Sequence, residues 1–206
     1  MNTVDLQEDP YNLIITGVGG QGNVLASRMV GDMLSRIGFD ITIGETFGAS
    51  QRGGSVMSHL RISKNSGCSP QIPIGRAHMI LSLEPSEALR VLKDYGNPEV
   101  KVLTNMRPVR SIGVISGEQT YPETDKIERW IMDLSSDAWF LDTTDAATRL
   151  GNPIFGNVML VGALAQVGDL PLSKDVFEAV VRARMPENKV AVNLEAFDFG
   201  KEMVVG

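Results

Sequence analysis

The sequence predicts an α/β fold, a doubly wound and mostly parallel Rossmann-like sheet with helices on both faces. Short apolar runs alternate along the chain with longer segments whose apolar residues recur at helical spacing. A glycine-rich turn, GVGGQG, joins the first of these runs to the first helical segment. No repeat, low-complexity tract or linker interrupts the alternation, so we expect one domain over residues 1–206, with its core over about 11–200.

The first predicted unit is a strand, a helix and a second strand. Residues 11–18 form a short apolar run, which indicates a buried parallel strand. A helical stripe follows and ends at Gly38. Residues 39–44 alternate and are β-branched, which predicts the second strand of a β-α-β unit. The residues expected to face the core from the helix are Leu25, Ala26, Met29, Val30, Met33, Leu34 and Ile37.

The rest of the chain repeats this alternation. Residues 63–76 and 107–124 are rich in glycine, proline and polar residues and are predicted to be irregular. The helix at 152–168 is apolar on nearly all sides, so we expect it to be deeply buried. Further strands are predicted over residues 55–62, 77–83, 100–104 and 139–141. Further helices are predicted over residues 85–95, 125–134, 143–150, 152–168, 173–184 and 189–203.

Composition excludes several classes of function. The chain has one cysteine, Cys68, and two histidines, His59 and His78. Because iron–sulfur clusters are normally held by four thiolates, we expect this chain alone to bind no cluster, and a Cys/His zinc site is not expected either. Both histidines are interpreted as packed residues. Trp130 and Trp139 are interpreted as core or interface anchors.

Charge and hydropathy bear on partners and location. The net charge of −6 argues against a nucleic-acid partner. The longest apolar stretch, residues 154–167, is shorter than the roughly 20 residues that a membrane span needs. The first ten residues lack the basic and apolar regions of a signal peptide, so the expected location is the cytoplasm.

The first glycine loop matches the pattern G-x-G-x-x-G between a predicted strand and a predicted helix. Three interpretations stay open. The glycines permit tight packing of strand on helix, or the free N–H groups of the helix contact an anion such as a CoA phosphate. The third is a stand-alone NAD-binding dehydrogenase, because Glu45 lies about where a ribose-binding acid would. The residues concerned are Gly17, Gly19, Gly20, Gln21 and Gly22.

A second loop, after the second strand, reads GETFGASQRGGSVMSHLRI together with its flanking strands. It places glycines, hydroxyls and an arginine at the carboxyl ends of strands, where ligands of open α/β sheets bind. Arg52 has the geometry to grip a carboxylate or phosphate with two hydrogen bonds. The sequence leaves two interpretations of this loop equally open, namely that it contacts a ligand or that it contacts another subunit. The candidate residues are Ser50, Gln51, Arg52, Gly53 and Gly54.

These two loops in tandem resemble the gamma-type domain of the 2-oxoacid:ferredoxin oxidoreductase family, especially small subunits of the indolepyruvate type. Softer matches are LEPSEALR at 83–90, Tyr121-Pro122, GN at 151–152, NVMLVGA at 157–163 and NLEAFDFG at 193–200. The resemblance extends from about Asn12 to Gly200. Asn23 stands where the family usually has an apolar residue.

The resemblance implies a subunit that assists the oxidative decarboxylation of a 2-oxoacid, here an arylpyruvate, to an acyl-CoA. It implies a large partner subunit that carries thiamine diphosphate, Mg2+ and the iron–sulfur clusters, with CoA as co-substrate and ferredoxin reached through the complex. No catalytic residue is assigned to this chain. The alternative to an assisting subunit is a purely structural scaffold, and self-association of the isolated chain stays open.

Overall fold

The computed structural model describes residues 6–48, 53–65, 67–110, 112–118 and 120–205. None of the described helices is both long and apolar enough to cross a bilayer. The strands are β1 (Tyr11–Val18), β2 (Asp40–Phe47), β3 (Ser55–Ser63), β4 (Met79–Ser82), β5 (Lys101–Asn105) and β6 (Asp137–Leu141). The helices are α1 (Asn23–Arg36), α2 (Pro85–Tyr95), α3 (Ile112–Ile115), α4 (Thr124–Leu134), α5 (Thr143–Arg149), α6 (Phe155–Val167), α7 (Lys174–Arg184) and α8 (Glu187–Val205).

One sheet contains all six strands in the order β2-β3-β1-β4-β5-β6. The strands β1, β4, β5 and β6 are parallel, and β3 runs antiparallel to both of its neighbours. The predicted fold class, a mostly parallel α/β sheet, is confirmed. The topology adds one feature to the predicted β-α-β unit, because β3 lies between β1 and β2 instead of at the edge of the sheet.

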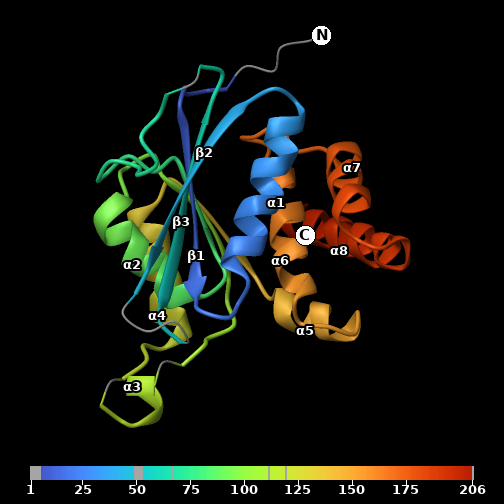
Figure 1. Ribbon diagram of the computed structural model, residues 1–206. Coiled ribbons are helices and arrows are strands. Elements are labelled where there is room, and N and C mark those ends of the chain that lie inside the picture. The colour runs from blue at the N-terminus through green and yellow to red at the C-terminus, as the bar shows by residue number, and fades with distance from the viewer. Residues whose placement is uncertain (1–5, 49–52, 66, 111, 119, 206) are drawn as a thin grey trace.

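Helices cover both faces of the sheet (Figure 1). The helices α1, α6 and α8 lie on one face, and α7 packs outside them on α1 and α8. The helices α2 and α4 lie on the other face. The short helix α3 projects away from the body of the molecule, beyond the carboxyl ends of the parallel strands (Figure 1). The segment 106–123 that carries α3 is called the arm below.

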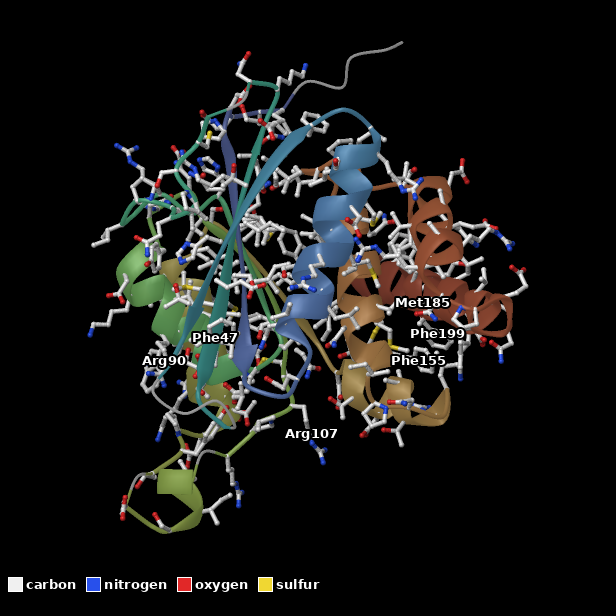
Figure 2. All side chains as sticks on the ribbon, viewed as in Figure 1. Phe47, Arg90, Arg107, Phe155, Met185 and Phe199 are labelled. Atoms are coloured by element: carbon white, nitrogen blue, oxygen red, sulfur yellow. The ribbon has the colours of Figure 1, made fainter. Side chains whose placement is uncertain are left out.

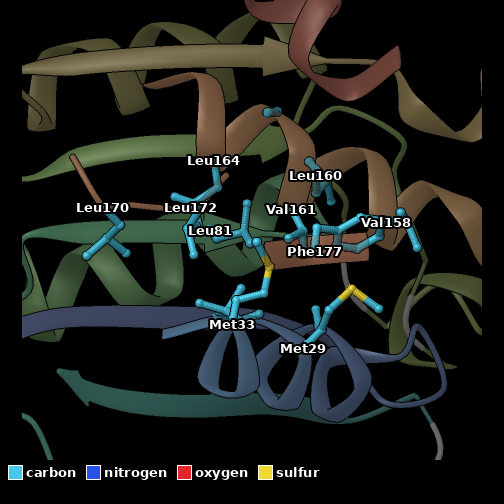
Figure 3. Close-up of a cluster of buried hydrophobic side chains, with 14 of the residues drawn as sticks. Met29, Met33, Leu81, Val158, Leu160, Val161, Leu164, Leu170, Leu172 and Phe177 are labelled. Carbon is cyan, nitrogen blue, oxygen red and sulfur yellow. The ribbon is translucent and has the colours of Figure 1, made fainter. Parts of the chain in front are cut away.

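The larger core lies between the sheet and the helices α1, α6, α7 and α8. Figure 3 shows Met29 and Met33 of α1 meeting Leu160 and Val161 of α6 in this core. Phe177 of α7 stacks on Phe197 of α8 with 4.4 Å between the ring centroids. Helix α6 is buried almost throughout, as predicted from its uninterrupted apolar sequence. Each large side chain buried in this way stabilises the fold by about 1.5–3 kcal/mol.

The structure corrects the predicted helical stripe at two positions. Leu25 is 39% exposed and Ile37 is 40% exposed, although both were expected to face the core. Trp130 is 45% exposed, so it is no core anchor, whereas Trp139 is half-buried against the larger core. Element ends also moved, and β2 reaches Phe47 because it pairs with β3 along its whole length. The predicted irregular segment at 107–124 contains the short helix α3.

Candidate functional site

The GVGGQG turn lies at the carboxyl end of β1, beside the point where the connections leave to opposite sides of the sheet. Ligands of open α/β sheets bind at such a switch point. Gly22 is the N-cap of α1, with φ of 92°. A Cβ at Gly22 would lie 2.3 Å from Nδ2 of Asn157, and one at Gly17 would lie 2.6 Å from Oδ1 of Asn23. A side chain at either position would displace these amide groups, and at Gly22 it would also have to adopt a positive φ.

Gly20 differs from its neighbours in the same turn. Its φ is 101°, and a Cβ built on it would meet nothing within 4 Å. Neither the core nor an adjacent side chain closes the space around it. The backbone here is open to an approaching group, because glycine carries no Cβ.

The side chain of Gln21 folds back onto the sheet. Its Oε1 accepts a hydrogen bond from the Val18 N–H at 2.7 Å, and its Nε2 donates to the carbonyl of Leu83 at 3.1 Å. Nδ2 of Asn157 donates to the Gln21 carbonyl at 2.8 Å. Asn157 therefore faces the site instead of capping α6. Gln21 shapes the turn by joining the ends of β1 and β4.

Hydrogen bonds join the two glycine loops directly. The Gly19 N–H donates to the Gly54 carbonyl at 2.7 Å, and the Gly53 N–H donates to the Gly19 carbonyl at 3.4 Å. The second loop is the hairpin between β2 and β3, so the insertion of β3 beside β1 brings it to the first loop. The other candidates in this loop, Ser50, Gln51 and Arg52, lie outside the described residues.

Among the cavities that flank this junction, two border the arm. One, of about 200 Å³, lies between the first glycine loop and the starts of α5 and α6. The other, of about 410 Å³, lies between the second glycine loop and the arm. Val109 of the arm lines both. The smaller cavity is lined by Gly20, Gln21, Asn105, Arg107, Thr143, Thr144 and Asn157, among others.

A buried carboxylate fastens the arm between these cavities. Glu84 is 0% exposed and caps the N-terminus of α2, where its Oε2 accepts from the Glu87 N–H at 3.0 Å. Its Oε1 accepts from the Tyr121 O–H at 2.5 Å and from the Val109 N–H at 3.3 Å. Burial and this hydrogen bond raise the pKa of Tyr121 above its usual range. Glu84 thus holds both ends of the arm.

A second buried acid joins α2 to the hairpin loop. Glu87, 4% exposed, accepts from the Ser55 O–H at 2.5 Å, and its other oxygen pairs with Nε of Arg90 at 3.2 Å. The Arg90 side chain is 65% exposed and lines the larger cavity, where Figure 2 shows it beside the hairpin end. Both acids belong to the LEPSEALR match at residues 83–90, and the sequence assigned neither of them a role. The signal was Glu84 directly before Pro85, the arrangement of an acidic N-cap.

The histidines and Glu45 stand apart from this junction. His59 is 1% exposed in the middle of β3, and Nδ1 of His78 accepts a hydrogen bond from Asn12 N–H at the start of β1. Burial lowers the pKa of both histidines. His59 is fully packed within the sheet, and His78 is half-buried with its ring 5.2 Å from that of Tyr11 between centroids. Glu45 is exposed on the edge strand, with β3 between it and β1. It therefore lacks the place of a ribose-binding acid, which lies on the strand next to the glycine turn.

Comparison with known proteins gives a consistent result. The family model described as pyruvate ferredoxin/flavodoxin oxidoreductase matches residues 12–203. The indolepyruvate oxidoreductase subunit IorB of Pyrococcus horikoshii is 40% identical over 200 residues, which cover 94% of this chain and 98% of that protein.

Two solved structures share the fold. The gamma subunit of a keto/oxoacid ferredoxin oxidoreductase from Geobacter sulfurreducens superimposes with a TM-score of 0.67 at 21% identity, over 95% of this chain and 98% of that one. The 2-oxoglutarate:ferredoxin oxidoreductase of Magnetococcus marinus, solved with 2-oxoglutarate, coenzyme A and succinyl-CoA bound, gives a TM-score of 0.73 at 18% identity. The match covers 97% of this chain and 32% of that one.

Proposed function

We propose, from the premise that this chain belongs to the pyruvate ferredoxin/flavodoxin oxidoreductase family, that it is the small subunit of an indolepyruvate:ferredoxin oxidoreductase. The observation that carries the proposal is the 40% identity to an indolepyruvate oxidoreductase subunit over nearly the full length of both chains. The complex would oxidatively decarboxylate an arylpyruvate, form the acyl-CoA and pass the electrons to ferredoxin.

In the proposed complex a large subunit carries the redox chemistry. The whole chain offers one cysteine and two histidines. His59 is buried in the middle of β3 and His78 is half-buried just before β4, and neither lines the cavities at the glycine loops. The described residues contain no group of three metal-ligating side chains. Thiamine diphosphate with Mg2+ and iron–sulfur clusters, when bound to that partner, would supply the decarboxylation and electron transfer. The contribution of this chain is then to bind and orient.

The glycine-loop junction is the proposed contact with the co-substrate. Gly19 and Gly54 hold the two loops together, and the open backbone at Gly20 borders the smaller cavity. A phosphate of CoA is the proposed occupant near the free N–H groups of α1. Ser50, Gln51 and Arg52 are the proposed side-chain contacts in the second loop.

Co-expression with a candidate large subunit tests the proposal. The purified complex is expected to reduce a dye only when an arylpyruvate and CoA are both supplied. A chain that forms no complex, or a complex inactive with every 2-oxoacid, contradicts it.

Arg52→Ala distinguishes ligand contact from scaffolding. In an intact complex, the proposed contact predicts a raised KM for CoA. A pure scaffold predicts altered assembly with an unchanged KM.

A further inference from the structure

An apolar groove runs between α1 and α7 on the face that bears the larger core. Its volume is about 380 Å³. It explains why Leu25 is 39% exposed on a helix whose neighbouring turns are buried, since Leu25 lines the groove instead of reaching the core. The residues that matter here are Val24, Leu25 and Arg28 of α1, Val180 and Arg184 of α7, and Met185.

The groove continues toward the glycine loops. Val24 also lines a second hollow, of about 670 Å³, whose other walls include Gly20 and Phe47. Phe47 is 55% exposed at the end of β2. Figure 2 shows Phe47 and Met185 on opposite sides of α1. The exposed apolar side chains are Leu25 in the groove and Phe47 in the adjoining hollow, and Val24 and Met185 are half-buried. Apolar side chains gathered in this way favour association, and the hollow also borders Gly20 of the proposed co-substrate junction.

The charge of the groove is opposite to that of the chain. The net charge is −6, yet the charged residues that line the groove are both arginines. Arg184 is paired with Asp32 at 2.5 Å, whereas Arg28 forms no ion pair with any described residue. Glu45, exposed on the same edge strand as Phe47, lines neither hollow. The groove is therefore complementary to an apolar segment that also carries a carboxylate.

A second copy of this chain fits the groove poorly. In a two-fold dimer the same patch meets itself, so a carboxylate opposite Arg28 would have to come from this patch. The charged residues that line the groove are both arginines, and the carboxylate of Asp32 nearby is already paired with Arg184, so a second copy offers Arg28 no partner.

We propose that the surface from Phe47 through Val24 to Met185, here called the α1–α7 groove with its adjoining hollow, is the docking surface for the large subunit. The occupant is an apolar segment of that subunit, with a carboxylate opposite Arg28. This inference rests on the proposed function, because it requires a large subunit. Beyond the proposed function, the inference names the surface of this chain that the large subunit contacts and the side chains of that surface that bind it.

Binding of the purified large subunit to the full small subunit tests the inference by titration calorimetry. Leu25→Glu places a charge in the apolar groove and is expected to weaken binding at least tenfold. Its control is Ile74→Glu, at an 80% exposed isoleucine just before β4, at the other end of the sheet. Arg28→Glu is expected to weaken binding at least fivefold, with Arg36→Glu on the same helix as the control. Both controls are expected to bind within twofold of the unaltered chain.

Each result of these binding measurements either supports or overturns the proposed docking surface. Groove variants that bind like the unaltered chain overturn the inference while the proposed function stands. A homodimer of the unaltered chain that Leu25→Glu dissociates, with binding of the large subunit unchanged, assigns the groove to a second copy and also overturns it. An unaltered chain that binds no large subunit removes the proposed function and the inference together. Arg28→Gln, expected to flatten the salt dependence of binding, gives the answer if Leu25→Glu does not fold.

Discussion

Glycines serve opposite purposes in two regions, the α6–α8 crossing and the loops at the carboxyl edge of the sheet. At the crossing, a Cβ on Gly200 would lie 1.8 Å from the Met159 carbonyl oxygen, and one on Gly162 would lie 2.0 Å from that of Phe197. In the loops, a Cβ on Gly20 or Gly53 would meet nothing within 4 Å. Glycine at the crossing lets two backbones touch, whereas Gly20 and Gly53 in the loops leave a backbone open to a molecule outside the chain.

The largest effect is expected at the crossing. Gly200→Ala forces a methyl group against a backbone carbonyl that cannot rotate away, so the helices must separate. We expect a loss of about 3 kcal/mol in the free energy of unfolding, at the upper end for overpacked cores. Urea denaturation followed by circular dichroism measures it.

Gly31→Ala is the matched control on a helix. The added methyl group would lie 3.1 Å from Cδ1 of Ile43, the far end of a flexible side chain. Alanine exceeds glycine in helix propensity by about 1 kcal/mol, so stability should be unchanged or slightly raised. Equal losses of unfolding free energy in Gly200→Ala and Gly31→Ala would show that a clash with a backbone carbonyl costs no more than contact with a flexible side chain.

The next effect concerns the arm at the carboxyl edge. Tyr121→Phe removes the hydroxyl that donates to the buried carboxylate of Glu84. Since hydrogen bonds to charged groups contribute more than neutral ones, we expect a loss of about 2 kcal/mol. Loosening of the arm should also speed tryptic cleavage after the exposed Arg110, measured by mass spectrometry. An unchanged cleavage rate would show that the arm does not depend on this anchor.

A smaller effect on stability is expected at Gly20. Alanine there meets no neighbour but must adopt a positive φ, which costs about 1 kcal/mol for a residue with a Cβ. If the open backbone contacts CoA, Gly20→Ala should raise the KM for CoA in the assembled enzyme more than the small loss of stability explains. Thermal denaturation measures the loss of stability, and steady-state kinetics measures the KM for CoA. An unchanged KM would show that CoA does not contact Gly20.

The smallest effect is the pH dependence contributed by the buried histidines. Burial lowers the folded-state pKa of His59 and His78 below the ordinary value of 6.5. The unfolded chain therefore takes up protons first, so this stability is fully present above pH 6.5 and is lost as the pH falls below it. Urea midpoints measured from pH 8 to pH 5 should fall. The fall should be shallower in His78→Gln, and equal slopes would assign the pH dependence to other groups.

Much of the fold could be predicted from local patterns. The alternation of apolar runs and helical stripes located the strands and most helices, and the uninterrupted apolar sequence of α6 predicted its burial. The predicted stripe on α1 was wrong at Leu25, because periodicity gives the direction of a face and not its width, and at Ile37, because the helix ends at Arg36. How far the buried face extends depends on where α7 packs.

The candidate site was predictable in part. The glycine loops were predictable because each has a distinctive local sequence. The scarcity of cysteine and histidine indicated that iron–sulfur clusters would be held by a partner subunit. The tether of the arm was not found. Glu84 meets Val109 and Tyr121, which lie 25 and 37 residues further along the chain, and no local pattern encodes such a contact.

The sequence by itself determined the fold class, the two glycine loops and the resemblance to a family, since all of these depend on neighbouring residues. Only the tertiary structure decided that β3 inserts beside β1, which joins Gly19 to Gly54 and leaves Glu45 at the far edge. Only the tertiary structure opened the groove between α1 and α7. The physical reason is that strand order and helix packing are set by contacts between distant segments, whose free energy is gained only when the whole core assembles.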